Sequence, residues 1–323
     1  MPDVSSQENG APEAGREIIL ASEDGVSLAG RRFAARDPAA SLLILHGMAE
    51  HIGRYRDFAG FLAAKGVEVY GFDLRGHGRT AELCGDAGFL TLNRGWDALV
   101  KDIDVWIDFI REENQGTPVF LLGHSLGSFL ARSYASSYGQ KLSGLILSGT
   151  GSVPKIRGAC LRLAAKISDE INGRKEPSTL LFRFIFRMYA RSVQRRRCRF
   201  DWLSRDGKIV DAYMADPLCG RPLPTGFMYD FLKAAAKLNK AAVINKTPRN
   251  LPVYIFSGSE DPVGNFSRGV SEVYKEYQKA GVCGITLKLY SGGRHEMLNE
   301  TNRGEVYRDV FAWIRRFSSF SPP

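Results

Sequence analysis

Residues 119–127 read Val-Phe-Leu-Leu-Gly-His-Ser-Leu-Gly, and this stretch decides the fold of the chain. The apolar residues before the glycine predict a buried strand, and residues 126–137 have a helix-compatible pattern. Between them lies the pattern G-x-S-x-G, formed by Gly123, Ser125 and Gly127. In such a strand–turn–helix elbow the serine adopts a strained backbone that exposes its hydroxyl above a sheet, and a Cβ on either glycine would clash. The stretch therefore predicts Ser125 as a nucleophile.

Short apolar runs alternate with helical patterns on both sides of this elbow. We expect strands at 17–21, 28–34, 41–46, 67–72, 119–123, 144–148, 251–257 and 285–290, and helices at 55–65, 96–113, 126–137, 266–280 and 302–317. Such an alternation predicts an open, mostly parallel sheet in an α/β fold. Strand-like runs are missing from residues 151–249, which look helical. We therefore expect a core of residues 16–150 and 250–319, a helical cap inserted at 151–249, and a disordered polar leader at 1–15.

Charge is distributed unevenly along the 323 residues, whose formal net charge is +9. Residues 151–250 hold 21 Lys and Arg against 8 Asp and Glu, whereas the rest of the chain has a net charge of −4. The five cysteines are widely spaced and form no C-x-x-C pair, which indicates neither a zinc site nor a disulfide framework. No apolar run approaches the roughly 20 residues that span a bilayer, and the N-terminus lacks signal-peptide features. We expect a cytoplasmic protein without a metal.

A serine hydroxyl attacks efficiently only when a histidine takes its proton and a carboxylate orients that histidine. In chains with this elbow the acid and then the histidine follow the serine. Only His295, in a Gly-rich loop after the predicted strand 285–290, lies late enough. Glu260 and Asp261 both follow the preceding strand. We favour Asp261, because Pro262 stiffens its turn, and expect Glu260 to face solvent.

Acyl transfer also needs two N–H groups directed at the oxyanion. The amide of Leu126, directly after the nucleophile, is one candidate. The second is the amide of Met48, because Gly47 allows the chain to turn at the end of the predicted strand 41–46. We expect the neighbouring His46 to bond the loop rather than act as a second base.

Several of these motifs together resemble a known family. They are residues 46–55 (HGMAEHIGRY), 73–78 (DLRGHG), 123–127 (GHSLG), 259–263 (SEDPV) and 293–296 (GRHE). The combination resembles the monoacylglycerol lipases and lysophospholipases, within the serine aminopeptidase S33-like α/β-hydrolases. Ser128 and Thr80 depart from the family's usual glycine and serine. We expect no aminopeptidase activity, because no acidic site for a free α-amine is recognisable.

The resemblance implies an α/β-hydrolase fold with an eight-stranded, mostly parallel sheet and an inserted helical cap, no cofactor, and hydrolysis of single-chain acyl esters. It also implies that Glu50 and Arg54 lie near the polar end of the substrate pocket. We therefore expect a serine carboxylester hydrolase that acts on monoacylglycerols or lysophospholipids through an acyl-enzyme. An acyltransferase with the same triad, or a non-catalytic ligand-binding protein of this fold, remains an alternative.

The predicted cap contains a basic, aromatic segment at residues 180–191 (LLFRFIFRMYAR), followed by three consecutive arginines. In a helix, Arg183, Arg187 and Arg191 would form one cationic stripe opposite an aromatic face. Such a helix can lie on an anionic membrane surface, which would make the protein peripheral to the membrane. Alternatively, its apolar face lines the acyl tunnel while the arginines stay in water. Nucleic acid is not expected as a partner, because no recognition motif accompanies the charge.

Overall fold

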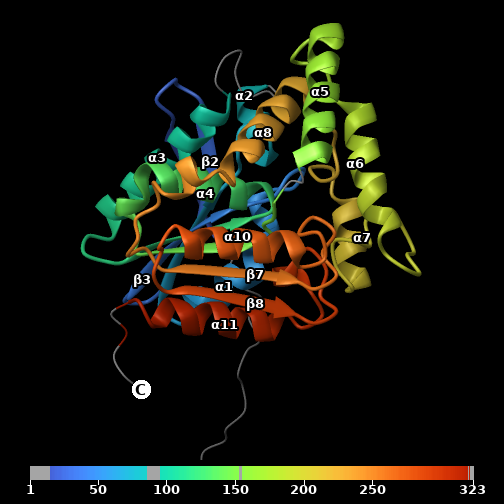
Figure 1. The fold of residues 1–323 in the computed structure, drawn as a ribbon. Coiled ribbons are helices and arrows are strands. Elements are labelled where there is room, and N and C mark those ends of the chain that lie inside the picture. The colour runs from blue at the N-terminus through green and yellow to red at the C-terminus, as the bar shows by residue number, and fades with distance from the viewer. Residues whose placement is uncertain (1–14, 86–94, 153–154, 319, 321–323) are drawn as a thin grey trace, which may run out of the picture.

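A computed structural model describes residues 15–85, 95–152, 155–318 and 320 of the chain. The predicted leader, apart from residue 15, lies outside the described residues. Figure 1 shows a central sheet with helices on both faces and a group of helices at one end.

The sheet has eight strands in the order β1-β2-β4-β3-β5-β6-β7-β8. Their bounds are β1 Arg16–Ala21, β2 Ser27–Phe33, β3 Ala40–Leu45, β4 Val67–Phe72, β5 Val119–His124, β6 Gly144–Ser148, β7 Val253–Gly258 and β8 Ile285–Tyr290. β2 pairs antiparallel with both β1 and β4, and every other pairing is parallel. The predicted α/β fold with a mostly parallel, eight-stranded sheet is confirmed. β3, β4, β5, β6 and β7 are buried throughout, as strands covered on both faces must be.

Two layers of helices cover the sheet. The helices of the core are α1 Arg56–Ala63, α2 Gly78–Cys84, α3 Gly95–Glu113, α4 Leu126–Tyr138, α10 Arg268–Lys279 and α11 Arg303–Arg315, with short 3₁₀ turns at Ile52–Tyr55, Gly139–Lys141 and Met297–Asn299. α1 and α11 pack together over one face, around Phe58 and Trp313. α3, α4 and α10 cover the other face, around Trp106 and Tyr134. The sequence pattern did not predict α2.

Five helices follow one another between β6 and β7 in the described residues: α5 Lys155–Asn172, α6 Thr179–Arg191, α7 Gly207–Ala215, α8 Thr225–Leu238 and α9 Ala241–Ile244. They occupy the stretch predicted as a cap, and we call them the cap helices. α8 packs on α5 and also on α3 and α4 of the core. Figure 1 shows α5, α6 and α7 at one end of the molecule. None of the described helices combines the length and the apolar character that crossing a bilayer requires.

Candidate active site

Ser125 occupies the sharp turn between β5 and α4. Its backbone has φ 50° and ψ −117°, a strained conformation for a residue with a side chain. The N–H of Ser125 donates to the carbonyl oxygen of Ser148 at 2.9 Å, and the Ser128 hydroxyl donates to the carbonyl oxygen of Ser125 at 2.6 Å. Ser128 therefore helps to hold the turn, although it departs from the family's usual glycine.

The two glycines of the G-x-S-x-G pattern are required by close backbone contacts. A Cβ on Gly123 would lie 2.2 Å from the carbonyl oxygen of Gly127. A Cβ on Gly127 would lie 2.2 Å from the carbonyl oxygen of Leu45, which ends the neighbouring strand β3. The first carbonyl belongs to the first turn of α4 and the second to β3, so both are backbone groups of regular structure, and the predicted steric reason for both glycines is confirmed.

Asp261 and His295 meet at the carboxyl ends of the adjacent strands β7 and β8. Nδ1 of His295 lies 3.0 Å from Oδ2 of Asp261, and both side chains are buried. The same Asp261 oxygen accepts a 3.0 Å hydrogen bond from the hydroxyl of Ser257, while Oδ1 accepts the N–H of Val263 at 2.8 Å. Glu260, the other acid considered, is exposed. These contacts leave the Nε2 side of the His295 ring available for another partner.

The charge of Asp261 determines the protonation behaviour of His295. Burial would lower the pKa of the imidazole, because it penalises the charged form. The negative charge and hydrogen bond of Asp261, together with the charges of Glu296 and Glu50, outweigh burial, so the pKa of His295 is raised. By contrast, burial lowers the pKa of His124, whose ring centre lies 4.7 Å from that of His295, to about 4. Of these two neighbouring histidines, His295 is therefore the stronger base.

Ser125, Met48 and Leu126 line one cavity of about 100 Å³. The described residues that line it carry no charge, and most are apolar. They are Met48, Ser125, Leu126, Phe129, Ser152, Leu161, Ile185, Phe186, Met188, Tyr189, Met228, Phe231, Leu232, Pro262, Val263 and Asn265. Leu126 begins α4, so its N–H has no partner within the helix. The structure thus brings the predicted nucleophile and both predicted oxyanion residues to an apolar cavity under α6 and α8.

His46 bonds the loop that carries Met48, as expected. Its Nε2 accepts the N–H of Leu74 at 2.9 Å, so its Nδ1 carries the proton and donates to the carbonyl oxygen of Gly47 at 2.7 Å. Burial lowers its pKa to about 4, which keeps the ring neutral. The ring therefore acts as a structural link.

Glu50 and Arg54 lie in a buried ion-pair network and are not among the described residues that line the cavity. Nη1 of Arg54 donates to Glu50 at 2.5 Å, and its two terminal nitrogens donate to the two carboxylate oxygens of Glu296 at 2.7 Å each. The other oxygen of Glu50 accepts the N–H of Gly47 at 2.5 Å and the hydroxyl of Tyr55 at 2.9 Å. Burial would raise the pKa of Glu50, but Arg54 above all lowers it to about 2. The network ties the loop before Met48 to the residue that follows His295.

Sequence reasoning gave no role to Glu296, Ser257 or Trp202. Glu296 lies in the quoted GRHE motif, so its place beside His295 was the one available signal. Trp202 comes from the loop after α6, and its ring centre lies 5.2 Å from that of His295. Ser257 lies four residues before Asp261, at the end of β7, and its contact with that carboxylate is local. No local pattern links Trp202 to the site, because its contact with His295 arises from the packing of distant segments.

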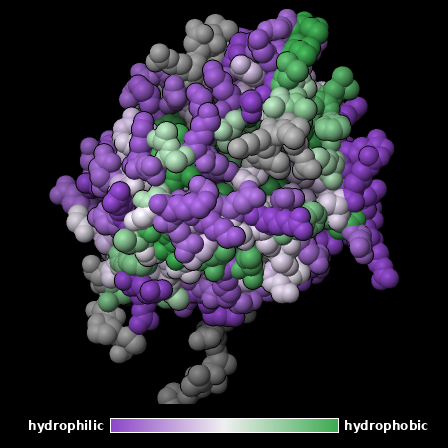
Figure 2. Space-filling model, viewed as in Figure 1, coloured by the Kyte–Doolittle hydropathy of each residue, from purple (hydrophilic) through white to green (hydrophobic). Residues whose placement is uncertain are grey.

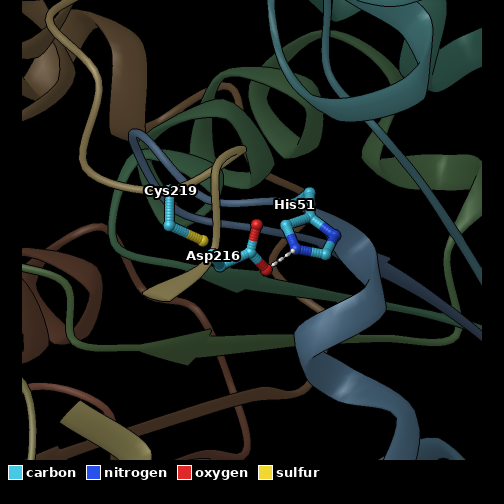
Figure 3. Close-up of side chains that lie close together, drawn as sticks. All are labelled: His51, Asp216 and Cys219. Carbon is cyan, nitrogen blue, oxygen red and sulfur yellow. Dashed lines mark hydrogen bonds and ion pairs between the residues drawn. The ribbon is translucent and has the colours of Figure 1, made fainter. Parts of the chain in front are cut away.

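Among the described residues, His51, Asp216 and Cys219 form one group whose side chains could hold a metal ion, with ligand atoms within 4.8 Å of one another (Figure 3). The sequence analysis did not foresee this group. Nε2 of His51 donates to Asp216 at 2.8 Å, and Nδ1 accepts the N–H of Gly53 at 3.2 Å. Burial raises the pKa of the Cys219 thiol, although metal binding needs the thiolate. The contacts therefore fit a hydrogen-bonded link between the cap and the loop after β3 better than a metal centre.

A serine on a strained elbow and a buried Asp–His pair, all at the carboxyl ends of a mostly parallel sheet, define an α/β-hydrolase. The chain belongs to the Hydrolase_4 family, described as serine aminopeptidase, S33, whose model matches residues 36–302. It is a serine hydrolase of the lipase and esterase type.

Individual relatives agree with this assignment. The chain is 27% identical over 282 residues to a monoacylglycerol lipase of Mycolicibacterium smegmatis, covering 86% of this chain and 89% of the relative. It is 28% identical to monoglyceride lipase of Mus musculus, covering 86% and 82%. The crystal structure of a highly thermostable carboxyl esterase from Bacillus coagulans in complex with glycerol superposes with a TM-score of 0.87 at 27% identity, covering 94% of this chain and 99% of the esterase.

Proposed function

We propose that the protein hydrolyses single-chain acyl esters, with Ser125 as nucleophile, His295 as base and Asp261 as the orienting acid. The observation that carries this proposal is the buried Asp261–His295 hydrogen bond, which occurs together with the strained Ser125 elbow at an apolar cavity. The monoglyceride lipases among its relatives support the substrate class.

In the proposed reaction Ser125 Oγ attacks the ester carbonyl carbon while His295 takes the hydroxyl proton. The Met48 and Leu126 amides would stabilise the oxyanion. When the intermediate collapses, the C–O bond of the ester breaks and His295 returns the proton to the leaving alcohol. Water then attacks the acyl-enzyme, with His295 again as base, and releases the fatty acid and free Ser125. An acyltransferase would differ only in using another alcohol in place of water.

Between the two expected substrates, the cavity favours a monoacylglycerol. No arginine, lysine or acidic side chain is among its described lining residues, so a phosphate in this cavity would lack a counter-charge. A neutral glycerol headgroup needs only hydrogen bonds, which Ser152 and Asn265 can supply from the lining. The cavity is smaller than the roughly 300–1,000 Å³ of ordinary ligand pockets. We therefore infer that α6 and α8 separate to admit a long acyl chain.

The test is kinetic. Purified protein should hydrolyse a p-nitrophenyl ester series and prefer monooleoylglycerol to lysophosphatidylcholine by at least tenfold in kcat/KM. Ser125→Ala should reduce turnover about ten-thousand-fold or more, whereas Ser137→Ala, at an exposed position on the same helix α4, should not. Retained activity in Ser125→Ala would refute the nucleophile, and an equal rate for lysophosphatidylcholine would refute the substrate preference. Acyl transfer to glycerol in place of release of fatty acid would identify an acyltransferase.

We also propose that the cap contacts an anionic lipid surface. Five apolar side chains of α5 and α6 are strongly exposed: Leu163, Ile167, Ile171, Leu180 and Phe184. Figure 2 shows hydrophobic residues gathered at the end of α5 that points away from the sheet. Arg183, Arg187 and Arg191 are exposed on the same helix α6, as the predicted stripe requires. Exposed apolar groups beside cations are typical of helices that bind at membrane interfaces.

A further inference from the structure

A second cavity, of about 620 Å³, lies along α6 and the segment that follows it. We call it the arginine cavity. Its described lining residues are Thr179, Phe182, Arg183, Phe186, Arg187, Ala190, Arg191, Arg196, Arg197, Cys198, Arg199, Phe200, Gly220 and Pro222. Of these, only Phe186 also lines the cavity of Ser125. The arginine cavity is therefore a separate site that shares one wall with the proposed active site.

All the charged side chains among the described lining residues of the arginine cavity are positive. Six arginines line it, and no acidic residue is among its described lining residues. Arg197 pairs with Asp201 and Asp211 at 3.5 and 3.3 Å. Within the described ranges, Arg183, Arg187 and Arg191 have no hydrogen-bond or ion-pair partner. Like charges gathered around one hollow raise the local positive potential, and an anion that enters relieves their repulsion.

The floor of the arginine cavity is apolar and firmly packed. Phe182, Phe186 and Phe200 are buried. The rings of Phe182 and Phe186 stack with centres 3.9 Å apart, and the ring of Phe200 stands at 81° to that of Phe186. Such a floor suits the apolar part of a ligand. Arginines that served only to keep the surface hydrated would not need a cavity lined by buried aromatic rings beside them.

Local hydrogen bonds hold the arginines that follow α6. Nη1 of Arg196 donates to the carbonyl oxygen of Ala190 at 3.2 Å, and the guanidinium of Arg199 lies 4.8 Å from the centre of the Phe200 ring. Asp201 accepts the backbone N–H groups of both Arg197 and Cys198. The loop is therefore fixed against α6, and its cations stay beside those of the helix.

We propose that the arginine cavity binds a phosphate-bearing amphiphile, with the phosphate among Arg183, Arg187 and Arg191 and the apolar part on the phenylalanine floor. A guanidinium group can donate two hydrogen bonds to the oxygens of one phosphate. A dianionic phosphate therefore suits a cavity lined by several arginines better than a singly charged anion does. The phosphate can belong to a lipid headgroup or to a soluble molecule. The inference does not depend on the proposed ester hydrolysis, since none of the proposed catalytic residues lines this cavity.

Isothermal titration calorimetry with octyl phosphate tests the site, with octyl sulfate and inorganic phosphate as comparison ligands. We expect one saturable site that prefers octyl phosphate to octyl sulfate by at least fivefold. The triple variant Arg183→Gln, Arg187→Gln, Arg191→Gln should weaken binding at least tenfold. The matched triple variant Arg195→Gln, Lys240→Gln, Lys246→Gln removes the same charge from exposed positions that do not line the cavity, and should change binding less than twofold. Thermal melts establish that both variants fold.

A second experiment, vesicle binding, distinguishes a lipid phosphate from the phosphate of a soluble molecule. Binding of phosphatidate vesicles that octyl phosphate displaces supports a lipid headgroup, and saturable binding of octyl phosphate without any vesicle preference supports a soluble ligand. Equal weakening by the two triple variants would overturn the proposal, because only diffuse charge would then matter. Vesicle binding without saturable binding of octyl phosphate would overturn it as well. None of these readouts uses ester hydrolysis, so failure here and failure of the proposed function are separate results.

Discussion

Arg54 forms a two-point salt bridge with Glu296, a residue 242 positions further along the chain, through hydrogen bonds of 2.7 Å to both carboxylate oxygens. The guanidinium also pairs with Glu50 and lies over the Tyr213 ring, 4.8 Å from its centre. Glu296 directly follows His295, and Glu50 accepts the N–H of Gly47. The Arg54 cation therefore connects the loop after β3 to the loop that carries His295. We infer that Arg54 positions these loops rather than contacting substrate, which differs from the role implied by the resemblance.

Replacing Arg54 tests this inference. Arg54→Met leaves two buried carboxylates without their counter-charge, and should lower the free energy of unfolding by about 3–5 kcal/mol. Arg308→Met, at an exposed position on α11, should change it by less than about 0.5 kcal/mol. Chemical denaturation measures both. A raised KM with an unchanged free energy of unfolding would instead indicate that Arg54 contacts the substrate.

Substitutions at the adjacent residues Asp261 and Glu260 test which of the two carboxylates orients His295. Asp261→Asn should lower kcat by about four orders of magnitude, since an amide stabilises the wrong tautomer of His295 and cannot support its positive charge. Glu260→Gln, at an exposed side chain one residue earlier, should stay within about twofold of the original protein. Kinetics with a soluble p-nitrophenyl ester separates the two variants, and comparable losses would speak against Asp261.

The pH profile should report the Asp261–His295 pair. His295 accepts a proton only when neutral, and its pKa is raised by Asp261 above the ordinary value of about 6.5. As pH falls through that raised pKa, His295 becomes charged and kcat/KM should fall. Removing the charge in Asp261→Asn should move this acidic limb of the residual activity to lower pH. An acidic limb below about pH 6 in the original protein would contradict the pairing.

Membrane contact by the cap predicts a loss of lipid binding when its apolar surface is removed. Leu180 and Phe184 are 83% and 62% exposed on α6. The double variant Leu180→Ser, Phe184→Ser should reduce co-sedimentation with anionic vesicles at least tenfold while soluble-ester hydrolysis continues. The control is the double variant Leu83→Ser, Leu289→Ser, which changes two exposed leucines outside the cap helices. It should leave co-sedimentation with the vesicles unchanged. If the two double variants behave alike, α6 is a lid and not a membrane anchor.

Much of this site could be predicted from the sequence because its signals are local. A strand, a turn with two glycines and a helix follow one another within a few residues, so the elbow at Ser125 is visible without any tertiary information. The chain order of serine, acid and histidine then predicted His295 after β8 and either Glu260 or Asp261 after β7, with Asp261 favoured because Pro262 follows it. All eight strands were also predicted, and several of the buried ones are apolar runs, as strands covered on both faces must be.

Other features were decided only when distant segments packed together. The sequence motif contains both Arg54 and Glu50, but their burial depends on Glu296 and on Tyr213 from the cap, and no spacing rule connects residues so far apart. Helical periodicity predicted the stripe of Arg183, Arg187 and Arg191. That this stripe borders a hollow with an aromatic floor depends on where the chain after α6 turns back. Local sequence therefore determined the backbone elements and the order of the reactive groups, whereas tertiary packing decided which charges are buried, which are paired and which remain free to bind a ligand.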